Sequence, residues 1–117
     1  MDAAENGLTP TSIGFVGTYP PTRCGIATFN ASLRTAIAPA CSGICALVDA
    51  EGPVSREEVV AQLVRGSRGS RRAAAAALND FDVVIVQHEF GIYGGRNGRE
   101  ALAIVRAIGP PVILVAH

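Results

Sequence analysis

Two titratable residues, His88 and Glu89, directly follow a run of apolar residues at positions 83–86 and a glutamine. Histidine changes charge near neutral pH, and a neighbouring carboxylate can orient it or share its proton. The segment continues with an aromatic residue and two glycines, Tyr93, Gly94 and Gly95. Titratable groups beside a flexible glycine segment indicate a ligand site at the exit of a strand. The alternative is that His88 is a hydrogen-bonded structural residue.

A second candidate site is formed by Cys24 and Gly25, which precede a predicted helix. The first backbone N–H groups of a helix have no partner within it, and a residue without a side chain lets an anion approach them. Arg23 could assist such an anion or simply be solvated, and Gly25 could merely permit a tight turn. His117 follows the last predicted strand and belongs to the same edge of the sheet, unless it is only a frayed terminus.

Four apolar runs predict the strands that would position these residues. They cover residues 12–18, 43–49, 82–87 and 112–116. The third run is unbroken by polar residues, which is typical of a central parallel strand that is covered on both faces.

Helices are predicted between these strands. The first begins after Gly25 and ends near Pro39, with an apolar stripe of Ile26, Phe29, Leu33 and Ile37. For the second, Ser55 and Glu58 form a capping box before Val59, Val60, Leu63 and Val64. This helix is expected to break within residues 65–72 and to resume through the alanines up to Leu78. A last helix is predicted over residues 99–108.

Alternation of strands and helices predicts an α/β, Rossmann-like parallel sheet with helices on both faces. The second strand should lie on one side of the first and the later two strands on the other. Ligands bind such sheets where the winding reverses, beyond the carboxyl ends of the strands. We expect one domain at residues 12–117 after a disordered leader at residues 1–11.

Composition narrows the function classes. The net charge is zero and the ten basic residues are scattered arginines, so the sequence predicts no nucleic-acid partner. No apolar run approaches the roughly 18 residues of a transmembrane segment, and a cytoplasmic protein is expected. The three cysteines, Cys24, Cys41 and Cys45, lack metal-site spacing, so free thiols, no metal and no cofactor are predicted.

Three motifs carry a resemblance to a known family: TYPPTRCGIATF (residues 18–29), DVVIVQHEFGIYGG (residues 82–95) and PPVILVAH (residues 110–117). In this order they resemble family 4 glycosyltransferases of actinobacteria. The resemblance implies a retaining enzyme of GT-B fold, the amino-terminal domain of which holds a sugar or lipid-linked acceptor. A carboxyl-terminal domain would hold the nucleotide sugar that donates a hexose such as mannose or glucose.

The resemblance also assigns roles to residues. Gly25 matches the last glycine of the family's glycine-rich loop, whereas Cys24 replaces the first of its usual glycine pair. His117 matches a histidine that contacts the transferred sugar. The family's donor-domain arginine, lysine and E-x7-E glutamate have no counterpart in the 117 residues. The sequence therefore predicts the acceptor-side portion of a glycosyltransferase, inactive alone. The alternatives are a stand-alone binding module and one half of an enzyme completed by a separate carboxyl-terminal half.

Overall fold

A parallel sheet with helices on both faces is the framework of this protein, seen in a computed structural model that describes residues 11–22, 24–37, 41–54, 56–88 and 99–117. In that part of the chain the sheet has five strands in the order β3-β2-β1-β4-β5, and every pairing is parallel. The strands are β1 (Ser12–Gly17), β2 (Cys41–Val48), β3 (Val59–Val64), β4 (Val83–His88) and β5 (Val112–Ala116). The predicted fold class and strand order are confirmed.

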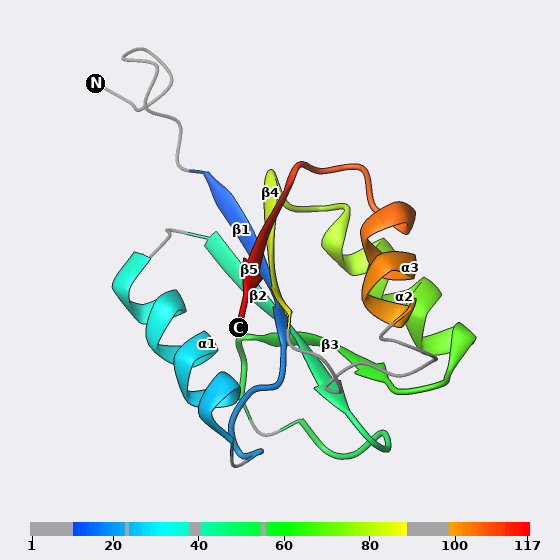
Figure 1. Cartoon of the computed structure of the whole chain (residues 1–117), viewed down its shortest axis with the longest axis horizontal. Coiled ribbons are helices and arrows are strands. Elements are labelled where there is room, and N and C mark those ends of the chain that lie inside the picture. The colour runs from blue at the N-terminus through cyan, green and yellow to red at the C-terminus, as the bar shows by residue number, and fades with distance from the viewer. Residues whose placement is uncertain (1–10, 23, 38–40, 55, 89–98) are drawn as a thin grey trace.

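Helices connect most of these strands: α1 (Gly25–Ile37), α2 (Arg68–Leu78) and α3 (Arg99–Ala107). Figure 1 shows α1 on one side of the sheet and α2 with α3 on the other. Within the described ranges, no helix has both the length and the apolar character needed to cross a bilayer.

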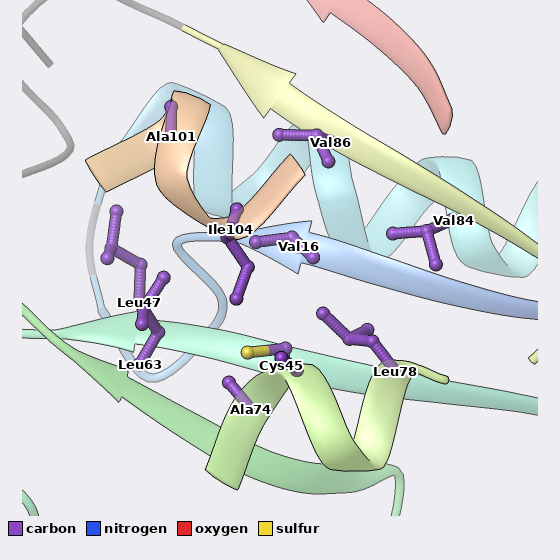
Figure 2. Close-up of a cluster of buried hydrophobic side chains, with 11 residues drawn as sticks. Val16, Cys45, Leu47, Leu63, Ala74, Leu78, Val84, Val86, Ala101 and Ile104 are labelled. Atoms are coloured by element: carbon purple, nitrogen blue, oxygen red, sulfur yellow. The ribbon is translucent and has the colours of Figure 1, made fainter. Parts of the chain in front are cut away.

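Two apolar cores lie on the two faces of the sheet, because successive side chains of a strand point to opposite sides. Val16, Cys45 and Val86 face α2 and α3, and Ile104 of α3 packs among them (Figure 2). Phe15, Ile44 and Ile85 form the second core, with partly buried side chains of α1 beside it. Both faces of the central strands are thus buried, which explains their unbroken apolar sequences.

A pair of glycines makes room for an aromatic ring on this sheet. Gly14 and Gly43 are direct neighbours in the β1–β2 register. A Cβ atom on Gly43 would lie 2.5 Å from Cζ of Phe81, and one on Gly14 would lie 2.9 Å from Cδ2 of Leu78. The side chains of Leu78 and Phe81 thus occupy the space that Cβ atoms at these two positions would fill. Both positions therefore require glycine.

The predicted helix at Val59–Val64 is wrong, because this segment is strand β3. An apolar pattern in a short segment fits a helix and a buried strand equally, and β-branched valines fit the strand. Glu58 caps no helix: its backbone carbonyl accepts the N–H of Ile44, which starts the pairing with β2. Ser55, the other half of the predicted capping box, is outside the described residues.

Helix α2 does not continue an earlier helix, contrary to the prediction. It begins at Arg68, with Ser67 as its N-cap accepting the N–H of Ser70. Gly66 has a φ of 81°, a left-handed conformation that favours glycine, and lets the chain turn from β3 into the helix. The glycine and serine residues therefore start this helix rather than interrupt one.

The predicted apolar stripe of α1 is only partly buried. Ile26 is buried, but Phe29 and Ile37 are 43% and 42% exposed. The helix instead buries Ile26, Ala27 and Asn30. On edge strand β5, Ile113 and Leu114 are also exposed.

Candidate functional site

The candidate site lies at the carboxyl ends of β1, β4 and β5. The chain passes from β1 through α1 to β2 on one side, and later through α2 to β4 on the other, so the winding reverses between β1 and β4. Such a reversal separates the connecting segments and leaves room for a ligand. Figure 1 shows the end of β5 close to the ends of these two strands. The sheet therefore has the expected switch point.

Thr18, Cys24 and the start of α1 meet just beyond β1. Oγ1 of Thr18 lies 3.2 Å from Sγ of Cys24, and that sulfur accepts the N–H of Ala27 at 3.4 Å. The thiol group thus occupies the place of an N-cap acceptor. Gly25 is the first residue of the helix, and no atom of the described residues lies within 4 Å of a Cβ built on it. In that part of the chain, the helix N-terminus therefore leaves the space that a closely approaching ligand would need.

A buried polar junction joins α1 to the sheet at this point. Asn30 is fully buried, and its Nδ2 donates to the Thr18 carbonyl at 3.2 Å. Gln87 of β4 is equally buried. A Cβ on Gly17 would lie 3.0 Å from Cβ of Gln87 and 3.3 Å from Nδ2 of Asn30. Gly17 thus permits two amide side chains to pack against the end of β1.

His117 joins this junction from β5. Its backbone N–H donates to the His88 carbonyl at 2.8 Å, and its Nε2 lies 2.7 Å from Oε1 of Gln87. Its ring meets Phe29 of α1 edge to face, with 5.1 Å between the ring centres. Phe29, which is half-exposed, thus contacts His117 at the edge of the sheet.

The two candidate histidines are neighbours in the backbone, but their side chains lie on opposite faces. Gln87 has the same strand parity as Ile85, on the α1 face, whereas His88 has the parity of Val86, on the face of α2 and α3. His117 contacts groups on the α1 face. His88 and His117 therefore do not form a pair of side chains.

Four candidate residues, Glu89, Tyr93, Gly94 and Gly95, lie outside the described residues, as does Arg23. In the described ranges, no three His, Cys, Asp or Glu side chains gather closely enough to hold a metal ion. Among the described residues, the polar groups gathered at the switch point include the Asn30 and Gln87 amides, the Cys24 thiol and the His117 imidazole. Both amides are fully buried, so the exposed thiol and imidazole are the groups that a ligand can reach.

A cavity of about 180 Å³ lies beside the switch point, and the sequence did not reveal it. Its walls include Tyr19 and Pro20 after β1, Val48 at the end of β2, and Val54 and Arg56 from the connection to β3. A β2–β3 connection without a helix was not expected, because β3 was assigned to a helix. The cavity that this connection lines was therefore not predicted from the sequence.

Tyr19 holds the wall of this cavity together. Its hydroxyl donates to Oε2 of Glu58 at 2.8 Å, and the Arg56 guanidinium lies 5.9 Å from the centre of its ring. Burial, followed by the hydrogen bond to Glu58, raises the pKa of Tyr19. The hydrogen bond from its own backbone N–H, followed by that from Tyr19, lowers the pKa of Glu58. Neutral tyrosine and ionised glutamate are therefore the stable pair in the folded protein.

Sequence reasoning also missed Asn30 and Gln87. A signal for Asn30 exists: it stands one helical turn after the buried Ile26, a position where an apolar residue is expected. Gln87 was noted only as the polar end of the strand. An amide side chain at a position where the apolar pattern calls for a buried residue could have indicated both.

The structure is that of a Rossmann-like domain with a buried polar junction at its switch point. No family model matches this chain, and no curated protein or solved structure matches it either.

Proposed function

We propose that this domain is the acceptor-binding side of a retaining glycosyltransferase of GT-B type. A second domain, in the same polypeptide or a separate one, would supply the nucleotide sugar. The observation that carries the proposal is the junction of Asn30, Gln87 and His117 at the switch point, with Gly25 open beside it. It coincides with the motifs that resemble family 4 enzymes.

The chemistry of this junction suits a hydroxyl-rich ligand. The exposed imidazole of His117 and the backbone N–H groups at the start of α1 can exchange hydrogen bonds with sugar hydroxyls, and the half-exposed ring of Phe29 offers apolar contact to a sugar ring. In a transfer reaction this side of the cleft would hold the acceptor in position for attack. Charge stabilisation of the departing diphosphate would fall to the other domain.

A titration followed by NMR tests acceptor binding. Methyl α-D-mannopyranoside and methyl α-D-glucopyranoside should shift the backbone signals of Thr18, Gly25 and His117 in the isotope-labelled chain. GDP-mannose and UDP-glucose should shift Thr18 and Gly25 less strongly, because the other domain would hold the nucleotide. Sugar shifts confined to other surfaces, or a clear preference for the nucleotide sugars, would contradict an acceptor-side role.

Gly25→Ala supplies a variant with a matched control. The added methyl group meets no atom of the described residues within 4 Å, so folding should persist while a ligand at the helix N-terminus is obstructed. Gly69→Ala makes the same change near the start of α2, again without a clash. Binding of the methyl glycosides should weaken in Gly25→Ala alone.

A transfer assay tests the division of labour. We expect the 117-residue chain alone to release no radiolabelled sugar from GDP-mannose or UDP-glucose above background. Turnover well above that background would show that a donor domain is not needed.

The cavity beside Tyr19 supports a second candidate function, that of a binding module without catalysis. Its walls are mainly apolar, and the Arg56 guanidinium can donate hydrogen bonds to an oxygen atom of a bound ligand. A ligand that shifted Tyr19 and Val54 but left Gly25 and His117 unchanged would favour this function over the first.

A further inference from the structure

The contact between Gln87 and His117 limits the chemistry that the imidazole ring can offer. Nε2 of His117 lies 2.7 Å from Oε1 of Gln87, within strong hydrogen-bond distance. An amide oxygen can only accept, so the proton of this bond belongs to the histidine. A neutral ring that carries its proton on Nε2 has an acceptor lone pair on Nδ1.

The surroundings hold both partners of this bond in place. Gln87 is fully buried and is packed against Gly17, where a Cβ atom would lie 3.1 Å from its Cγ. His117 is fixed by its backbone bond to His88 and by the ring of Phe29. Among the described residues Nδ1 of His117 has no hydrogen-bond partner. The second ring nitrogen is therefore the one left for a ligand.

We infer that Gln87 is a positioning residue that holds His117 as the Nε2–H tautomer, so that Nδ1 accepts a hydrogen bond from a ligand hydroxyl. The ligand class, a polyhydroxylated molecule such as a sugar, rests on the proposed function. The assignment of the tautomer is independent of the proposed function. Nδ1 of neutral His117 would form no hydrogen bond with a ligand group that can only accept one, such as an ether oxygen.

Long-range ¹H–¹⁵N NMR of the histidine-labelled 117-residue chain tests the tautomer directly. Spectra recorded at about pH 8.5 report the tautomer of the neutral imidazole ring. A His88→Gln variant identifies the His117 signals by elimination. Wild-type His117 should show a protonated Nε2 and an unprotonated Nδ1. A protonated Nδ1 would overturn the inference, because Gln87 would then present its amide nitrogen instead.

Two substitutions of Gln87 separate positioning from mere packing. Gln87→Leu fills similar space without an acceptor, so the ring should approach the tautomer mixture of free histidine in the same buffer. Its Nε2 proton should exchange with water about tenfold faster than in the wild type. Gln87→Glu keeps an acceptor oxygen and should retain the Nε2–H form. An unchanged tautomer and unchanged exchange in Gln87→Leu would overturn the inference.

Circular dichroism establishes whether each variant folds. If Gln87→Leu does not fold, the wild type still decides, since a neutral His117 ring with its proton on Nδ1 contradicts the inference. These measurements use no ligand. A failed methyl glycoside titration beside a confirmed tautomer would therefore reject the proposed function while leaving the role of Gln87 intact.

Discussion

The hydroxyl of Tyr19 donates a hydrogen bond of 2.8 Å to Oε2 of Glu58, across 39 positions of sequence. It links the segment that follows β1 to the residue that precedes β3. The β2–β3 connection contains no helix in its described part, and this bond helps to hold the connection against the sheet.

Tyr19→Phe should lower the free energy of unfolding by about 1 kcal/mol, the typical net value of one hydrogen bond. Urea denaturation measures this loss. Glu58→Gln, which keeps an acceptor oxygen for the hydroxyl, should be less destabilising. A larger loss in Glu58→Gln than in Tyr19→Phe would contradict this account.

The stabilisation by Tyr19 should depend on pH in two windows. The pKa of Glu58 is lowered on folding, so its contribution is present above the ordinary value of 4.5 and lost as pH falls through the folded pKa. The pKa of Tyr19 is raised, so its contribution is present below 10.0 and lost as pH rises through the folded pKa. The stability difference between wild type and Tyr19→Phe should thus be flat near neutral pH and shrink at both extremes.

Gly43→Ala should destabilise the protein by about 1–3 kcal/mol, the usual penalty of overpacking. The new methyl group would lie 2.5 Å from Cζ of Phe81 and 3.0 Å from Val60. Gly52→Ala is the matched control, because nothing lies within 4 Å of the added atom. Equal melting temperatures for the two variants would show that Phe81 can move aside at little cost.

The three thiols should differ in reactivity. Cys24 and Cys41 are exposed, whereas Cys45 is buried in the core and burial raises its pKa to about 12. The thiolate is the reactive form, so iodoacetamide should label Cys24 and Cys41 in the native protein and Cys45 only after unfolding. Peptide mass spectrometry before and after addition of urea reads this out. Native labelling of Cys45 would indicate an open core.

Glu100→Ala should lower the free energy of unfolding by about 2 kcal/mol, in the range of hydrogen bonds to charged groups. Glu100 of α3 is buried, its Oε1 accepts the N–H of Gly66 at 2.8 Å, and its Oε2 lies 3.7 Å from Arg71. Glu100→Gln keeps the acceptor for Gly66 and should lose less. If both variants lose the same amount, the ion pair with Arg71 matters more than the bond to Gly66.

Strands β1, β2, β4 and β5 could be predicted from sequence because each contains a short apolar run. Strand β3 could not: the pattern of Val59, Val60, Leu63 and Val64 satisfies a helix as well as a strand. Pairing with β2 through the Glu58 carbonyl decides between them. The pattern within residues 59–64 does not reveal this pairing, because β2 is a separate segment of the chain.

The candidate site divides in the same way. Sequence by itself determined which residues stand at strand ends and helix starts, since periodicity and chain order fix Gly25, His88 and His117 there. Only the tertiary structure decided that His117 contacts Gln87 and Phe29 while the side chain of His88 turns to the opposite face. The sheet order, the β4–β5 register and the packing of α1 on the sheet set those contacts, and each depends on segments that are far apart in the chain.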